Sequence, residues 1–441
     1  MAASPLSPEQ ILALAPDASS ADAGRKLATE RYWGGLGRTE RAAWGECQGS
    51  AVYQVRVDLG DLASKCSCPS RKFPCKHVLG LLLLTVAGRP PEGTPPEWVA
   101  EWLSKRAATA ERKAKREAEG APPVDLEAQA QRVAERYQKV LKGLEALSVW
   151  MEDLVRQGFA GLEAESALWH TQAARLVDAQ APGLAAQVRR LGALPGSGPD
   201  WPQRMLERLG RLALTAEAWK RLEELPPPLA TDLRTHVGIP LREEDVKARG
   251  ERLVDTWAVM SQELDDTEHL RSQRTWLLGT TTGRTALILQ FAAGASMPFA
   301  EVFVPGTVFS AELVFWPSAA PQRAGVQERQ GDSPPWPSAL PSFTLEALCQ
   351  HFADTLSRQP FHERTAALLA PVTPRVDAAR RWWLQAPSGE AIRLGPGERW
   401  RLLALSGGHP LAVFGEWDGE VFQPLSALVE GRLYPLIGGR P

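Results

Sequence analysis

Cys66-Ser-Cys68-Pro-Ser-Arg-Lys-Phe-Pro-Cys75-Lys-His77 is the stretch that decides how the N-terminal part of this chain folds. Two thiols stand two residues apart, six residues follow, and then a thiol and an imidazole stand two residues apart. Three thiolates and one imidazole are a common closed ligand set for structural Zn²⁺. Residues i and i+2 of a strand point the same way, so Cys66 and Cys68 can reach one ion. The pattern predicts one structural zinc ion held by Cys66, Cys68, Cys75 and His77.

The last two ligands stand where a helix is expected to begin. Pro74 fixes the approach of the chain, and the apolar run at 78–86 is typical of a buried helix. Three thiolates outweigh one Zn²⁺, so the centre carries about one net negative charge, which the positive end of the helix helps to offset. Nearby cations can do the same: Lys65, Arg71, Lys72 and Lys76. A metal-free disulfide among these thiols is the alternative, and we disfavour it because no secretion signal is recognisable.

The pattern Cys-x-Cys-x6-Cys-x-His resembles the SWIM zinc finger. Residues 44–50 and 53–58 resemble the β-hairpin that precedes the ligands in that family. The resemblance implies a ββα unit over about residues 40–88 that binds DNA or other proteins. Bacterial SWIM proteins of this length are often encoded beside MoxR-type AAA+ ATPases and von Willebrand factor A proteins, which implies an accessory role in a multi-protein assembly.

Composition limits the remaining possibilities. A chain of 441 residues is too long for one ordinary core, so several domains are expected. The net charge is −2, so any nucleic-acid binding must come from a local basic patch. The first residues lack the basic start and apolar core of a signal peptide, and the longest apolar run, around 78–87, is too short to span a bilayer. We expect a cytoplasmic protein without a membrane partner.

Hydrophobic periodicity predicts a multidomain α+β architecture. Apolar residues recur at steps of three and four after residue 125, which favours a helical bundle, and the period shifts towards two near residue 245. The predicted parts are N-terminal helices with the zinc finger (1–88), a linker with a basic helix (89–124), a helical domain (125–240), an antiparallel-sheet α+β domain (245–370) and a small β subdomain (375–441).

The basic helix, expected over 97–117, is the most cationic stretch of the chain. Its cations are Lys105, Arg106, Arg112, Lys113, Lys115 and Arg116. Together with Arg71, Lys72 and Lys76 of the finger they could follow a phosphate backbone, where each neutralised phosphate adds salt-dependent affinity. A solvated helix that joins two domains is the simpler interpretation, and we favour it.

Short apolar runs predict the C-terminal strands. In the α+β domain they lie at 256–261, 274–278, 285–291, 300–304 and 310–316, followed by a proline-rich loop (317–342) and a helix (343–358). In the last part they lie at 381–384, 400–405, 411–415 and 421–424, which suits a small β-barrel or a meander packed on the sheet.

Motifs for catalysis were weighed and set aside. Residues 279–285 resemble a phosphate-binding loop, but the spacing is short, Arg replaces the lysine and a strand follows, so a hairpin turn is favoured. The acidic residues at 243–245 and 265–266, with His269, fit exposed caps and turns. Cys349 and His351 are too close in sequence to meet across a helix, and His362 lies beyond its end.

We also favour Cys47 as a small buried side chain over a fifth ligand or a reactive thiol. We therefore predict that the protein is not an enzyme.

These observations predict a zinc-binding recognition or adaptor protein whose finger docks a protein partner, within an AAA+ ATPase-linked assembly of the kind that the resemblance implies. The alternative is a nucleic-acid-binding protein that uses the finger and the basic helix at 103–118. A second alternative is an enzyme with an unrecognised site in residues 245–441.

Overall fold

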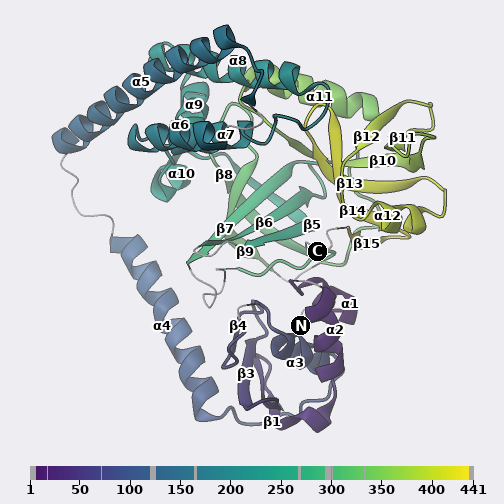
Figure 1. Ribbon diagram of the computed structural model, residues 1–441. Helices are drawn as coiled ribbons and strands as arrows, with labels where there is room; N and C mark the ends of the chain where they lie inside the picture. The colour runs from purple at the N-terminus through teal and green to yellow at the C-terminus, as the bar shows by residue number, and fades with distance from the viewer. Residues whose placement is uncertain are drawn as a thin grey trace.

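The computed structural model describes residues 6–16, 18–70, 72–119, 126–162, 166–266, 270–293, 299, 301–331 and 334–436. A zinc-finger region, a helical bundle and two C-terminal β structures follow one another along the chain (Figure 1). The predicted multidomain α+β class, with the finger at the N-terminus, helices in the middle and sheet at the C-terminus, is confirmed. Among the described residues, no helix has both the length and the apolar character needed to cross a membrane.

The N-terminal region is built on a four-stranded antiparallel sheet in the order β1-β2-β3-β4. Its elements are α1 (Pro8–Ala13), α2 (Ala18–Leu27), the 3₁₀ turn η1 (Glu30–Tyr32), β1 (Trp33–Arg38), β2 (Ala42–Gln48), β3 (Val52–Asp58), β4 (Ser64–Cys66) and α3 (Lys76–Val86). The predicted hairpin is β2–β3, and the predicted helix is α3. The sheet is wider than the expected ββα unit, because β1 pairs with β2 and β4 pairs with β3.

The sheet of the finger is covered on both faces. On one face, Val55 and Val57 pack in one cluster with the buried α3 side chains, such as Leu79. On the other face, Trp44 packs against Val99 of α4 (Glu97–Glu119).

The start of α4 is held to the finger by polar contacts as well. The guanidinium of Arg56 lies 5.1 Å from the ring centre of Trp98 and 5.8 Å from that of Trp102. The connecting segment is also fixed, since the amide of Arg38 donates to the carbonyl of Pro91 over 2.9 Å. The predicted boundary between residues 88 and 89 therefore lies inside one folded unit, because the apolar side of α4 needs the sheet to leave water.

The middle of the chain is helical, as predicted. It comprises α5 (Leu126–Gln157), α6 (Ser166–Asp178), α7 (Pro182–Leu191), α8 (Trp201–Lys220), α9 (Pro227–Val237) and α10 (Glu243–Arg249). The first five of these helices share one core, in which Leu144, Trp169, Leu184 and Trp219 are among the buried residues. The acidic residues at 243–245 form the first turn of α10, where carboxylates favour the positive end of a helix.

A closed barrel of five strands follows the helices. Its strands are β5 (Arg252–Asp266), β6 (Leu270–Gly279), β7 (Thr285–Ala293), β8 (Val308–Phe315) and β9 (Arg323–Gln330), in the order β5-β6-β7-β9-β8. Trp257, Leu277 and Phe315 lie in the core of this first barrel.

One strand prediction, at 300–304, and the loop prediction at 317–342 were wrong. Residues 301–304 are irregular, because Phe303 packs in the barrel core while Val304 packs in the core of the finger. β9 lies inside the predicted loop 317–342. Its sequence is mostly polar and only Ala324 is fully buried, so the apolar alternation that marks a strand is missing.

A second β structure completes the chain. It contains α11 (Leu345–Arg358), β10 (Thr365–Val376), β11 (Trp382–Gln385), β12 (Ala391–Leu394), α12 (Arg399–Ser406), β13 (Leu411–Trp417), β14 (Val421–Val429) and β15 (Arg432–Pro435). The sheet order is β12-β11-β10-β13-β14-β15, and a further parallel pairing of β12 with β14 closes five of the strands into a second barrel.

The structure corrects two further predictions here. Residues 400–405 belong to the helix α12, not to a strand. Leu402 is fully buried there with Leu403 and Leu405 packed beside it, a spacing that suits one face of a helix. The predicted division at residues 370–375 falls within β10, whose first half packs on the first barrel while its second half pairs with β11.

Candidate metal centre

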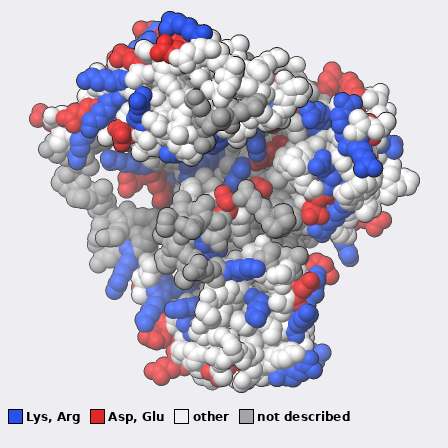
Figure 2. Space-filling model, viewed as in Figure 1, with Lys and Arg blue, Asp and Glu red and all other residues white. Residues whose placement is uncertain are grey.

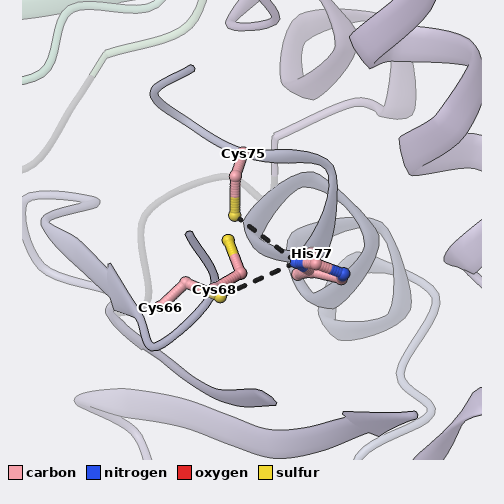
Figure 3. Close-up of side chains that lie close together, drawn as sticks. All are labelled: Cys66, Cys68, Cys75 and His77. Atoms are coloured by element: carbon pink, nitrogen blue, oxygen red, sulfur yellow. Dashed lines mark hydrogen bonds between the residues drawn. The ribbon is translucent and has the colours of Figure 1, made fainter. Parts of the chain in front are cut away.

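The four predicted ligands come from two elements that meet at one end of the finger (Figure 3). Cys66 ends β4 and stands opposite Val55 of β3. Ser67 continues this pairing by exchanging hydrogen bonds with the backbone of Gln54, which keeps Cys68 near the sheet. Cys75 is the N-cap residue of α3, and His77 lies in its first turn. The nitrogen and sulfur ligand atoms of all four residues lie within 4.8 Å of one another.

The distances fit one tetrahedral ion. His77 Nδ1 lies 3.7 Å from Cys66 Sγ and 3.8 Å from Cys75 Sγ. Zn–S bonds of about 2.3 Å and a Zn–N bond of about 2.0 Å at tetrahedral angles place sulfur and nitrogen about 3.5 Å apart. Because Nδ1 faces both thiols, it is the imidazole atom that would bind the ion. Four protein ligands close the coordination sphere, as in structural zinc sites.

Contacts among the thiols shift the pKa values of Cys66 and Cys68 in opposite directions. The pKa of Cys68 lies far below that of a free thiol because the thiols of Cys66 and Cys75 donate hydrogen bonds to its sulfur. The pKa of Cys66 is raised by its hydrogen bond to Cys68, by Cys75 and by burial. Zinc would be held by thiolates, so its binding would release the protons that these thiols carry.

The loop that joins the two ligand pairs also contacts the first barrel. The guanidinium of Arg271, a buried residue of β6, lies 5.4 Å from the ring centre of Phe73 and 5.1 Å from that of Phe299. Further along the interface, the Gln10 side chain donates to the carbonyl of Gly306 over 2.9 Å. The metal loop is thus part of the interface between the finger and the first barrel.

Comparison with protein families agrees with this geometry. The SWIM zinc finger family model matches residues 53–85, which span β3, β4, all four ligands and most of α3. The N-terminal unit is a SWIM zinc finger. A second model, the SWIM-associated four-helix bundle domain, matches residues 135–237, within α5 to α9. No curated protein and no solved structure is similar enough to the chain to be matched.

The SWIM finger is a site for one metal ion, as the sequence predicts. Cys47 of β2 is fully buried in the core beside the site and is not one of the four clustered ligands. Burial raises the pKa of its thiol to about 11. This placement agrees with the interpretation of Cys47 as a small buried side chain.

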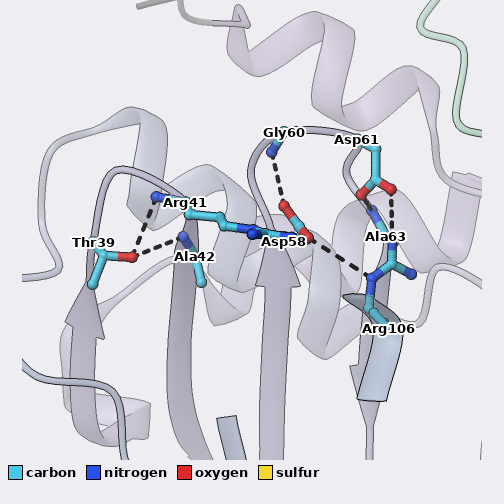
Figure 4. A network of polar contacts seen from close by, with 8 residues as sticks. All are labelled: Thr39, Arg41, Ala42, Asp58, Gly60, Asp61, Ala63 and Arg106. Atoms are coloured by element: carbon cyan, nitrogen blue, oxygen red, sulfur yellow. Dashed lines mark hydrogen bonds and ion pairs between the residues drawn. The ribbon is translucent and has the colours of Figure 1, made fainter. Parts of the chain in front are cut away.

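The cations proposed for nucleic-acid binding are not all available. In Figure 4, Arg106 of α4 reaches Asp61 and also Asp58, whose carboxylate lies 3.8 Å from its Nε. Lys105 pairs with Glu101 over 2.6 Å.

The remaining candidates divide into two groups. Lys72, Lys76 and Arg112 are exposed. Arg71 and the side chains of Lys113, Lys115 and Arg116 lie outside the part of the chain that the structure describes. The two aspartates that neutralise Arg106 could not be assigned from the sequence, because Asp58 at the end of β3 and Asp61 in the next turn are far from α4 in the chain.

The glycine-flanked loop at 279–285 is a hairpin turn built around an internal carboxylate. The Asp255 side chain accepts hydrogen bonds from the amides of Thr281 and Thr282, over 3.2 and 3.0 Å, and from the Thr282 hydroxyl over 2.7 Å. A carboxylate at the centre of the turn would repel a phosphate, so the prediction of a hairpin turn is confirmed.

The other motifs weighed for catalysis stay apart. Cys349 is exposed, whereas the ring of His351 packs on Phe343 with a centroid distance of 5.3 Å. His362 is buried and its Nε2 is hydrogen-bonded to the Thr365 hydroxyl over 2.7 Å. His269 lies outside the described residues.

A cleft of about 730 Å³ lies between the helical bundle and the second barrel, and no sequence motif indicates it. Its apolar lining includes Leu212 and Leu214 of α8 and Phe352 and Leu356 of α11, and its arginines are Arg190, Arg204, Arg208, Arg211 and Arg364. Three of these arginines recur about one helical turn apart on α8, a spacing that the sequence shows. The barrel side of the cleft could not be predicted, because it comes from residues far away in the chain.

One wall of the cleft carries a buried imidazole. His236 of α9 accepts a hydrogen bond at Nε2 from the Gln187 amide nitrogen over 3.1 Å, and its ring packs on Phe361. Burial lowers the pKa of His236 to about 4. The ring is therefore neutral near neutral pH and can accept the hydrogen bond from Gln187.

Proposed function

We propose that the protein is a zinc-stabilised adaptor that binds a protein partner in the cleft between α8 and the second barrel. The cleft carries this proposal, since ligand sites favour interfaces between domains and interface anchors are rich in aromatic and arginine side chains. The sequence predicts that the finger itself docks the partner. Because α3 and α4 cover both faces of the finger sheet, we place the docking surface in the cleft and not on the finger.

The lining of the cleft defines the chemistry of the partner. Leu214 is 71% exposed, an unusual degree for a leucine in a folded helix, and it lines the cleft near Arg208 and Arg211. In the described part of the chain Arg208 makes no ion pair, and Arg211 pairs only with Glu207, an exposed neighbour on the same helix. The cleft is also lined by the acidic residues Glu207, Glu363, Asp418 and Glu420. The exposed Leu214 with Arg208 and Arg211 on the α8 wall therefore suits an acidic segment that carries an apolar side chain and docks on that wall.

The finger has a structural role in this proposal. A closed Cys₃His centre leaves no position for a substrate, so zinc would contribute folding energy and keep the metal loop against the first barrel. The proposal assigns no catalysed reaction to the chain. By the family resemblance, AAA+ ATPases and von Willebrand factor A proteins are the first partners to test.

The test is capture of partners by the zinc-loaded protein, followed by titration calorimetry with each purified candidate. We expect Leu214→Asp and Arg208→Glu to weaken binding at least about tenfold, because each acts on the centre of the proposed surface. Lys142→Glu, an exposed charge reversal on α5, is the matched control and should bind as the wild type. Unchanged affinity in both cleft variants would rule out the cleft as the docking surface.

A further inference from the structure

The two C-terminal barrels have the same strand order. In the first barrel β5, β6 and β7 form a meander, β9 runs parallel to β7, and β8 lies between β9 and β5. In the second barrel β10, β11 and β12 form a meander, β14 runs parallel to β12, and β13 lies between β14 and β10. Five-stranded Greek-key barrels of the oligonucleotide- and oligosaccharide-binding type bind ligands on the face of their second and third strands.

The corresponding face of the first barrel is buried. Trp276 and Leu278 of β6 point away from the barrel core and pack against Leu368 and Phe414 of the second barrel. Leu287 of β7 packs against the same cluster. The first barrel therefore uses this face to hold the second barrel.

The corresponding face of the second barrel carries a row of cationic and aromatic side chains. Trp383 of β11 stands opposite Arg375 of β10 and opposite Arg393 of β12. Its neighbours Trp382 and Leu384 are buried in the core, so by strand alternation Trp383 points to the outer face. Paired residues of adjacent strands share a face about 4.8 Å apart, which gives an Arg–Trp–Arg row across three strands.

The row is accessible and its tryptophan is held in place. Arg375 and Arg393 are exposed, and neither makes an ion pair within the described ranges. The Trp383 ring nitrogen donates to the Asp377 carboxylate over 3.1 Å, and the Arg381 guanidinium lies 5.6 Å from the ring centre. Asp377 also accepts from Arg381 Nε over 2.8 Å, so the ring orientation is fixed before any ligand binds.

The local charge suits a polyanion. Residues 375–401 contain six arginines and three acidic residues, although the whole chain has a net charge of −2. Figure 2 shows Lys and Arg side chains gathered over the part of the second barrel that carries β10, β11 and β12 in Figure 1. This patch differs from the basic helix that the sequence singled out.

We propose that the outer face of β10, β11 and β12 binds single-stranded nucleic acid. A base stacks on Trp383, and the phosphates on either side pair with Arg375 and Arg393. Bases of single strands are open to stacking on aromatic side chains, whereas those of a duplex are not. This surface is separate from the cleft, so the proposal does not depend on the binding of a protein partner.

Fluorescence anisotropy with a labelled oligo-dT, an oligo-rU and a duplex of the same length tests this proposal on the full zinc-loaded chain. We expect both single strands to bind more tightly than the duplex, and the ratio of the two affinities tells DNA preference from RNA preference. Trp383→Ala should weaken binding at least about fivefold, the effect of losing one stacked base. Trp383→Phe keeps a stacking ring without the bond to Asp377 and should recover most of the affinity.

The arginines are tested through the salt dependence. Arg375→Ala combined with Arg393→Ala should reduce the slope of log affinity against log salt by about 1.4, or about 0.7 for each lost phosphate contact. Lys139→Ala combined with Lys142→Ala removes two exposed charges from α5 and is the matched control. Thermal unfolding checks that each variant is folded.

Three results would overturn the proposal: no binding of either single strand at low salt, equal loss of affinity in the α5 control, or binding of an acidic polypeptide but not of oligonucleotides by the same residues. Trp383→Ala should retain the protein partner of the cleft, so failure of this proposal and failure of the adaptor proposal remain distinguishable.

Discussion

Cys75 is both the residue before α3 and the third ligand of the metal site. Its thiol is buried with His77, and its backbone carbonyl accepts the first hydrogen bond of the helix, from Leu79 over 3.1 Å. We expect Cys75→Ser to lower bound zinc from about one ion per chain to almost none, because a structural site needs all four ligands. Without the ion, hydrogen exchange should accelerate in β1 to β4 and α3 but not in α6 to α8, whose core is separate. Zinc content and exchange by mass spectrometry measure both effects.

Cys349→Ser is the control for this experiment. Cys349 is exposed on α11 and lies outside the ligand cluster, so this variant should keep its zinc and the exchange pattern of the wild type. Global unfolding of Cys75→Ser would contradict the independence of the helical bundle. It would show that the contacts of the finger with the first barrel carry much of the stability of the chain.

At this scale the metal site could be predicted completely from the sequence. All four ligands lie within twelve residues, so their chemistry and spacing are local properties. The partners of the cations could not be predicted in the same way. Arg106 is neutralised by Asp58 and Asp61, which precede it by more than forty residues, and only the docking of α4 brings them together.

Helices and strands whose apolar residues repeat at regular spacing were predicted from the sequence, and those without such a repeat were not. α5 and the pair β2–β3 repeat apolar residues at the spacing of a helix and of strands, respectively. β9 is polar along most of its length, and α12 is short enough for its leucines to fit either period. The local sequence pattern does not predict an element whose structure is stabilised mainly by the elements packed around it.

The buried His236 of α9, in the wall of the cleft, makes the stability of the protein depend on pH. Burial lowers the pKa of His236 to about 4, whereas the unfolded chain has a value near 6.5. As the pH falls, the unfolded state therefore takes up a proton before the folded state does. The contribution of His236 to the free energy of unfolding is fully present above about pH 6.5 and is lost as the pH drops towards 4. Nearby Glu363 opposes the shift and Arg190 adds to it. Urea unfolding at pH 7 and pH 5 should show the wild type weaker at pH 5.

His236→Gln removes this titration and keeps a hydrogen-bonding side chain opposite Gln187. The variant should lose less stability than the wild type between pH 7 and pH 5. Some loss should persist, because burial also lowers the pKa of His362 to about 4. His409→Gln, at an exposed position, is the control and should retain the full difference of the wild type. An identical pH response in His236→Gln would refute this account of the cleft wall.

For the whole molecule, the order of the parts follows from the sequence but their contacts do not. Composition and period locate the finger, the helices and the sheets, since each is a property of consecutive residues. The closure of the barrels depends on the parallel pairings β7–β9 and β12–β14, which join strands that are not consecutive in the chain. The packing of one barrel on the other depends on apolar residues that the sequence could place only on a strand.

Glu416 connects the two barrels and gives the sharpest test of their packing. Its side chain is 1% exposed and accepts hydrogen bonds from Arg274 over 2.7 Å and Trp276 over 2.8 Å in the first barrel, and from Arg364 over 3.0 Å in the second. Glu416→Gln removes the negative charge and leaves two guanidiniums facing each other. Because Arg274 and Arg364 are 36% and 51% exposed, water relieves part of this repulsion, and the expected loss is about 2 kcal/mol, less than for a fully buried pair.

Denaturant unfolding followed by tryptophan fluorescence measures this loss, since Trp276 lies at the contact. Glu312→Gln is the matched control. It breaks the Arg252–Glu312 pair on the surface of the first barrel, where exposed pairs contribute about 0–1 kcal/mol. If Glu416→Gln lost no more stability than this control, the barrels would be held by their apolar contact alone. If it lost stability only in the second barrel, with the first barrel unchanged in hydrogen exchange, the two barrels would unfold independently.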